Sequence, residues 1–181
     1  MAISIVALRG AAGFVVQARL AAFAKARAAE GLRVAGCVEE FSGSEGAGCA
    51  GRALRDVATG RRRLIGQELG SGSLACHLDA EGVTQACQDA LEAIDRGCDL
   101  LILAKFGKLE AARSGLVDAF AAAVERHIPI VTSVAPQFAD LWDVYSGGLA
   151  TYAEPSRTVL ESWWLGLRGS HSAPSLLRAA M

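Results

Sequence analysis

The sequence lacks the features that mark several large classes of protein. Its 181 residues carry 18 basic and 19 acidic side chains, so it has no basic excess of the kind that nucleic-acid-binding and membrane-surface proteins use. No apolar run reaches the roughly 18 residues that span a bilayer, and no basic segment precedes an apolar one at the start. We therefore expect no nucleic-acid partner, no membrane insertion and no signal peptide. With 52% hydrophobic residues, the chain is also too apolar to be disordered.

The five cysteines form no CxxC pair, and their number is odd. A chain of this length builds a core without disulfides, so we predict reduced thiols and a cytoplasmic protein. Cys49, Cys76 and His77 flank a predicted hairpin and are the candidates for a metal site, because thiolate and imidazole bind transition metals. Because they lack close ligand spacing, the favoured alternative is small buried residues or loop cysteines without a metal role.

Lysine is scarce. Of the 18 basic residues, only Lys25, Lys105 and Lys108 are lysines. Two of them lie three residues apart, in the segment Lys105-Phe106-Gly107-Lys108-Leu109-Glu110. Because arginine would serve a solvated surface equally well in this chain, the pair favours a role in anion binding, with Glu110 pairing with one lysine or orienting it. Two ordinary surface lysines in a loop remain the alternative.

The hydrophobic pattern alternates between short apolar strands and amphipathic helices. Strands are predicted at residues 3–8, 34–38, 100–103 and 128–132, with hairpin strands at 53–57 and 62–66. Helices are predicted at residues 14–30, 80–96, 114–126, 136–146 and 154–167. This alternation predicts a single three-layer α/β domain at 1–168, with a mainly parallel sheet and a β-hairpin insertion. A loose tail is expected at 169–181.

Ligands of such sheets bind at the carboxyl ends of the strands. Four segments are expected to meet there: 9–14, 39–51, 105–110 and 133–137. The first, Arg9-Gly10-Ala11-Ala12-Gly13-Phe14, joins a strand to a helix, where backbone N–H groups and the helix dipole attract anions. A full P-loop would also carry a lysine and a hydroxyl residue where this chain has Val16 and Gln17. This segment, called the glycine loop below, is therefore either a weakened anion site or an ordinary turn.

The order of these motifs resembles the small P-loop nucleoside-triphosphatases first described from thermophiles. Gly10-Ala11-Ala12-Gly13 stands at their phosphate loop, and Leu54-Arg55-Asp56-Val57-Ala58-Thr59-Gly60 at their hairpin insertion. Their two Walker B acidic residues fall on Ala104 and Lys105. The resemblance implies a P-loop NTPase-like fold whose Walker A motif is degenerate.

A closer resemblance is to the bacterial domain-of-unknown-function family 2478 (DUF2478), a degenerate relative of that group. It covers roughly residues 3–165 and is carried by the Lys105 to Glu110 segment, by Gly147-Gly148-Leu149-Ala150-Thr151, and by Cys49 and Cys76. Members of the family are often found near molybdate-transport genes, and some are labelled as molybdenum-transporter ATP-binding proteins. The resemblance therefore implies a molybdenum connection.

These features support three functional hypotheses. The first is a binding module for a small oxyanion, with molybdate suggested by the family, or for a nucleotide phosphate. It would use Arg9, the backbone of 10–14, Lys105 and Lys108, and it requires both lysines and the glycine loop to share one pocket of unmatched positive charge. The second is a nucleoside-triphosphate hydrolase, or a kinase-like transferase, in which one of the two lysines replaces the lost Walker lysine. The third is a ligand-free partner, such as a homodimer, assembled through a helix that carries tryptophans.

Overall fold

The computed structural model describes residues 4–41, 51–67 and 77–171. The main strands are β1 (Ile5–Leu8), β2 (Val34–Phe41), β3 (Arg52–Asp56), β4 (Arg62–Leu64), β7 (Leu100–Ile102), β8 (Ile130–Ser133) and β9 (Ala150–Ala153). They form one sheet in the order β4-β3-β2-β7-β8-β1-β9. All neighbours from β2 to β9 are parallel, and the β3–β4 hairpin joins β2 antiparallel. A second small sheet pairs β5 (Gly66–Gln67) with β6 (His77–Leu78).

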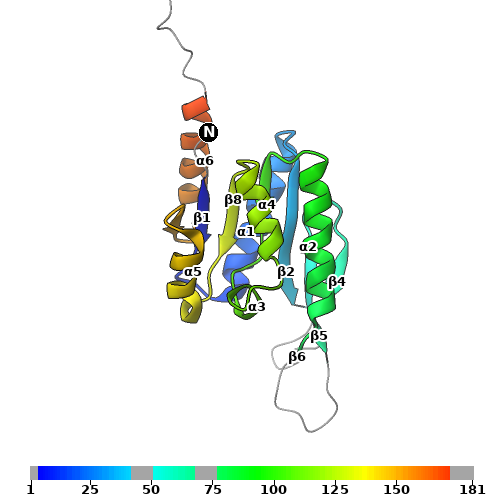
Figure 1. Cartoon of the computed structure of the whole chain (residues 1–181). Coiled ribbons are helices and arrows are strands. Elements are labelled where there is room, and N and C mark those ends of the chain that lie inside the picture. The colour runs from blue at the N-terminus through cyan, green and yellow to red at the C-terminus, as the bar shows by residue number, and fades with distance from the viewer. Residues whose placement is uncertain (1–3, 42–50, 68–76, 172–181) are drawn as a thin grey trace, which may run out of the picture.

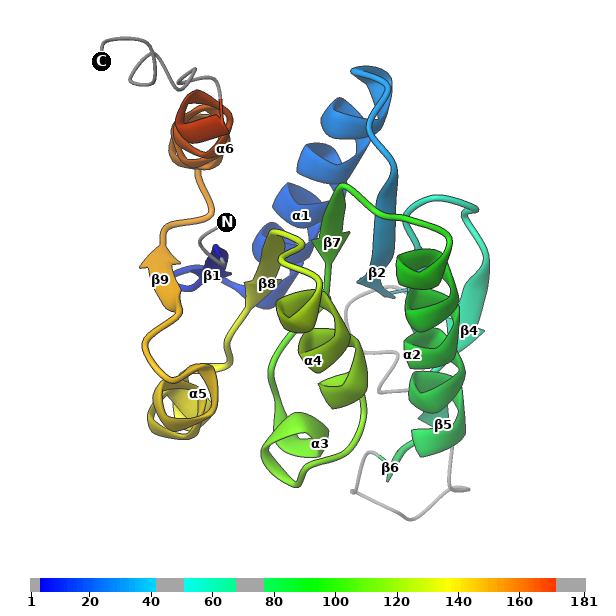
Figure 2. The ribbon, with the colours of Figure 1, turned by 45° about the horizontal axis from the view of Figure 1, so that its top comes forward.

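Helices cover both faces of this sheet (Figure 1; Figure 2). One face carries α1 (Gly13–Ala29) and α6 (Arg157–His171), and the other carries α2 (Ala80–Asp95) and α4 (Val117–Glu125). The shorter helices are α3 (Lys108–Ala111), η1 (Pro136–Phe138) and α5 (Ala139–Ser146). The predicted three-layer α/β architecture with a hairpin insertion is confirmed. No helix within the described ranges is long and apolar enough to cross a bilayer.

The strand β7 shows why its sequence is apolar at every position. Leu100 and Ile102 pack into the core under α1 and α6, while Leu101, and Leu103 just after the strand, pack into the core under α2 and α4. Because helices cover both faces of the sheet, neither side of this strand meets water. The strand therefore anchors both cores and fixes the position of the residues that follow it.

The structure differs from the sequence prediction at several element boundaries. β9 lies where no strand was predicted, because Ala150-Thr151-Tyr152-Ala153 becomes extended through pairing in register with β1. The helix expected from Ser114 begins only at Val117. Gly115 has a φ of +67°, which is not helical, so the helix cannot include it. The tail expected from 169 is wrong for its first residues, because α6 continues to His171; the remainder lies outside the described residues.

The tryptophans pack mainly inside the molecule. Trp142 is 1% exposed and lies edge-on to Phe106 and Phe120, with ring centroids 5.2 and 5.6 Å away. Trp164 is buried against Phe23 of α1. These two tryptophans are therefore covered by their own chain, and a homodimer assembled through a helix that carries tryptophans stays a prediction.

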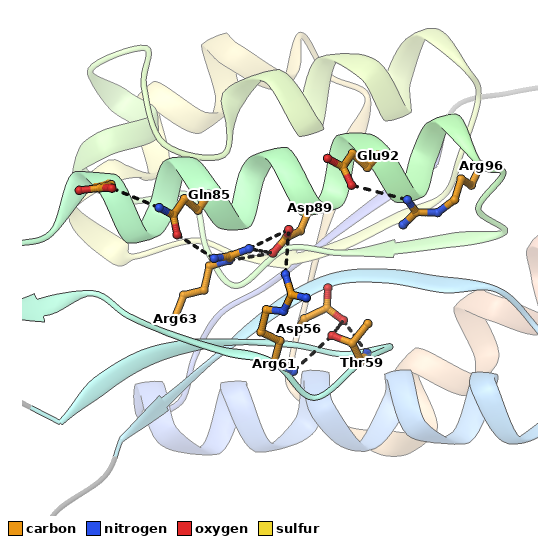
Figure 3. Close-up of polar contacts among 9 residues, drawn as sticks. Asp56, Thr59, Arg61, Arg63, Gln85, Asp89, Glu92 and Arg96 are labelled. Carbon is orange, nitrogen blue, oxygen red and sulfur yellow. Dashed lines mark hydrogen bonds and ion pairs between the residues drawn. The ribbon is translucent and has the colours of Figure 1, made fainter.

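The β3–β4 hairpin is fastened to α2 by Arg63 (Figure 3). Its Nε and Nη2 donate to the two carboxylate oxygens of Asp89 over 2.7 and 2.9 Å, and Nη1 donates to Gln85 Oε1 over 2.7 Å. Arg61 approaches the same carboxylate at 3.9 Å. This clamp holds β3 beside α2, so that residues of β3 border the space at the carboxyl edge of the sheet.

Asp89→Ala is expected to lower the free energy of unfolding by about 1–2 kcal/mol, because a bidentate, partly buried arginine pair is stronger than an exposed one. Glu92→Ala on the same helix is the control, since Glu92 and Arg96 form a mostly exposed pair at 3.6 Å. Urea unfolding of both variants measures the difference. Equal, near-zero effects would show that Arg63 does not clamp the hairpin in solution.

Candidate functional site

A cleft of about 250 Å³ opens at the carboxyl edge of the sheet, on the face covered by α2 and α4. Its lining includes residues from three of the four segments expected to converge: Glu39 in β2, the segment Lys105–Glu110 after β7, and residues 135–138 after β8. The expected convergence of all four segments is therefore met only in part. No residue of the glycine loop lines this cleft.

A buried carboxylate organises the cationic side of the cleft. Glu39 is 5% exposed, and its Oε2 accepts a hydrogen bond from Lys105 Nζ over 2.9 Å. Its Oε1 accepts from Arg52 Nε over 2.7 Å and also from Arg52 Nη2. The expectation of an unmatched charge at Lys105 is therefore wrong, because this ammonium group already has an internal partner.

Glu110 has a different role from the one expected. Its side chain is buried, and its Oε2 and Oε1 accept the backbone N–H groups of Gly107 and Leu116, each over 3.0 Å. A carboxylate that receives two backbone donors cross-links the ends of the loop that contains α3. Glu110 therefore shapes this loop, and among the described residues it forms no ion pair with a lysine. The alternative expectation, that it orients a lysine, stays a prediction.

Lys108 is the cation that remains available. It is exposed, begins α3 and lines the cleft. No ion pair of Lys108 is found in the part of the chain that the structure describes. The structure thus brings Lys105 and Lys108 to one cleft but leaves only the second without a carboxylate.

The glycine loop lies at the same edge of the sheet but belongs to the α1 face. Residues 9–14 are all exposed, and a Cβ added at Gly10 or Gly13 would meet nothing within 4 Å. Phe14, 69% exposed, lines a separate hollow between α1 and β2 that also includes Gln17 and Glu39. The lysines and the glycine loop therefore border two neighbouring hollows and do not share one pocket.

Gln17 connects these two regions. Its side-chain Oε1 accepts from the backbone N–H of Glu39 over 2.7 Å, and its Nε2 donates to the carbonyl of Ala104 over 2.8 Å. Ser133 Oγ donates to the same carbonyl over 2.7 Å. A buried amide therefore joins α1 to β2 and to the residue that follows β7 and Leu103.

Sheet order sets the distance between the glycine loop and Lys105. β8 lies between β1 and β7, and neighbouring strands are about 4.8 Å apart, so the ends of β1 and β7 lie roughly 10 Å apart. A ligand that contacts both loops must span this distance. A single tetrahedral oxyanion is too small to do so.

Arg9, the first residue of the glycine loop, is held in place by an aromatic ring. Its guanidinium lies 3.7 Å from the ring centroid of Tyr152 in β9, a cation–π contact. The Tyr152 hydroxyl donates to Asp143 Oδ1 over 2.8 Å. Partial burial, together with this carboxylate, raises the pKa of Tyr152 to about 12. The ring therefore stays neutral and keeps Arg9 next to the first glycine.

The candidate metal residues receive no support from the described part of the chain. Cys49 and Cys76 lie outside the described residues, and His77 is described only as the backbone of β6. No cluster of three or more histidine, cysteine, aspartate or glutamate side chains occurs among the residues that are described. Burial raises the pKa of the Cys37 thiol to about 12, which keeps this core cysteine protonated.

Comparisons with known proteins agree with this architecture. The crystal structure of THEP1 from the hyperthermophile Aquifex aeolicus superposes with a TM-score of 0.57, covering 96% of this chain and 100% of that one at 14% identity. The fold is therefore P-loop NTPase-like. The "Molybdenum import ATP-binding protein ModC 2" of Bradyrhizobium diazoefficiens is 39% identical over 146 residues. That match covers 80% of this chain but spans only 16% of the relative's length.

A family model described as "Protein of unknown function (DUF2478)" matches residues 5–163, which include the whole sheet and most of its helices. The match also includes the glycine loop, Glu39, the Lys105–Glu110 segment and β9. The chain belongs to the DUF2478 family.

Proposed function

We propose that this protein binds a small anionic ligand, either an oxyanion or the phosphate of a nucleotide, at the carboxyl edge of its sheet. The proposed site is the cleft that holds both lysines, and it replaces the single pocket shared with the glycine loop that the first hypothesis required. The observation that carries the proposal is the charge of the cleft. Three cations line it, Arg52, Lys105 and Lys108, and its two carboxylates are already engaged, one by cations and one by backbone donors. A hydrogen bond to a charged group contributes about 1.5–3 kcal/mol, so Lys108 alone would matter for affinity.

The glycine loop supports a ligand with more than one acidic group. The start of α1 offers backbone N–H groups to an anion, and Arg9 stands beside it on Tyr152. A nucleotide is long enough to contact this loop and, at the same time, the cleft that Lys105 and Lys108 line. The P-loop NTPase-like fold makes such a ligand reasonable.

A molybdenum connection rests on the name of the Bradyrhizobium relative. That protein is described as an ATP-binding protein of molybdenum import, and this chain matches a small part of it. We propose an accessory role in molybdate uptake or molybdenum metabolism, in the cytoplasm, and include molybdate among the ligands to test.

Titration calorimetry at low ionic strength tests the proposal, with molybdate, tungstate, sulfate, phosphate and ADP as ligands. We expect at least one to bind, and Lys108→Ala to weaken it about tenfold or more. Lys25→Ala is the matched control, because Lys25 is an exposed lysine of α1 outside the cleft. Absence of binding for every ligand, or equal losses in both variants, would reject the site.

Phosphate release from ATP or GTP decides between binding and hydrolysis. Since the chain has Gln17 and Ala104 where P-loop enzymes hold Mg²⁺, we expect no magnesium-dependent release. Release that disappears in Lys105→Ala would instead support the nucleoside-triphosphate hydrolase.

A further inference from the structure

We infer that the ligand of this cleft is an organic anion, in which a singly or doubly charged acidic group is joined to a compact apolar body. This inference rests on the proposed anion site and differs from the proposed function in the ligand, which is neither a bare oxyanion nor a nucleoside triphosphate. The cleft has a cationic side and a larger apolar side. The apolar side is formed by six residues: Leu54, Ile65, Val83, Leu109, Leu116 and Phe138.

Exposure shows how the two sides are arranged. Leu54, Ile65, Val83 and Leu116 are 2–4% exposed and belong to the core under α2 and α4, so they form the bottom of the cleft. The side chains of Arg52 and Lys105 are 23% and 33% exposed, and Lys108 is exposed. The cations therefore lie toward solvent, above an apolar floor.

This arrangement does not suit a bare oxyanion. Each oxygen of such an ion needs a hydrogen-bond donor or water, and an oxygen turned to an apolar wall has neither. An ion that stayed with the cations would leave the floor uncovered. An apolar group attached to the ion would cover it, and each methylene buried there adds about fourfold to the affinity.

Size and charge limit the ligand further. Pockets for drug-sized ligands hold about 300–1,000 Å³, so a cleft of about 250 Å³ suits a single ring or a short alkyl chain. The three cations and two carboxylates of the lining leave one formal positive charge. A carboxylate or phosphate-monoester head matches this charge better than a triphosphate does.

The test compares ligands that share one head group. Calorimetry with inorganic phosphate, methyl phosphate and phenyl phosphate is expected to show rising affinity, with phenyl phosphate at least tenfold tighter than phosphate. Binding of phenyl phosphate should also show a more negative heat-capacity change, because it buries apolar surface. Equal affinities for the three ligands would overturn this inference and leave the proposed anion site standing. No binding by any of them would count against the proposed function itself.

Variants locate the apolar body. Ala135 lines the cleft, so the larger side chain in Ala135→Phe should fill it. The affinity for phenyl phosphate should then fall to that for inorganic phosphate. Ala18 lies in the hollow on the α1 face, and Ala18→Phe is the matched control that should change nothing. Val83→Thr, which is nearly equal in shape, is the second variant should Ala135→Phe fold poorly. It should weaken the binding of phenyl phosphate and leave the binding of inorganic phosphate unchanged. Loss of phenyl phosphate binding in Ala18→Phe, with Ala135→Phe unaffected, would place the ligand in the other hollow and overturn the inference.

Discussion

Gly36→Ala is expected to lower the free energy of unfolding by about 4 kcal/mol or more, a large part of the roughly 5–15 kcal/mol that stabilises a typical domain. Gly36 lies within β2 with a φ of +101°, a conformation that strains any residue with a Cβ. A Cβ built there would lie 1.9 Å from the carbonyl oxygen of Ile102 in β7. Because this atom belongs to the backbone of a central strand, no side-chain rotation relieves the clash.

Urea unfolding followed by tryptophan fluorescence measures this effect. Gly166→Ala is the control, because Gly166 is exposed within α6 and an added Cβ meets nothing within 4 Å. That variant should be more stable by about 0.5–1 kcal/mol, since alanine favours helix over glycine. A loss below 1 kcal/mol in Gly36→Ala would mean that β2 and β7 pair differently from the arrangement described.

Glu110→Ala is the substitution with the second-largest expected effect. It removes the acceptor of two backbone N–H groups and leaves both without a partner in a buried setting, at a cost of about 1–3 kcal/mol each. We expect a total loss of about 2–6 kcal/mol in the free energy of unfolding. Glu110→Gln should fall between this variant and the unchanged protein, because the amide keeps one acceptor oxygen.

The same variants separate stability from binding. The loop that Glu110 cross-links carries Lys108, so Glu110→Gln is also expected to weaken anion binding at a temperature where the protein remains folded. Glu125→Ala is the control, because this exposed glutamate lies at the end of α4, away from the cleft. Unchanged stability in Glu110→Ala would contradict the buried position of the carboxylate.

The sequence predicts most of the architecture because each helix and strand of the core carries its own local signal. Asp79 accepts the backbone N–H of Glu81 at the start of α2, as a helix cap should, and β7 is apolar because both of its faces are covered. β9 has no such signal. Its four residues become a strand only because β1 lies beside them, and that proximity follows from the order of the sheet.

The candidate site is harder to derive, because its decisive partners are far apart in the chain. Lys105 is recognisable by its rarity, but Glu39, its carboxylate partner, precedes it by 66 residues. In the sequence, Gln17 is only a residue that does not fit the P-loop pattern. Its hydrogen bonds to Glu39 in β2 and to Ala104 after β7 depend on the fold. Glu110 binds backbone groups, which no comparison of side-chain charges reveals.

The amide of Gln17 also has a mechanical consequence. It ties α1 to β2 and to Ala104, just after β7, so α1 cannot move away from these two strands without breaking two buried hydrogen bonds. A displacement of α1 is therefore transmitted to β2 and to the start of the segment that carries both lysines, and these parts should move together.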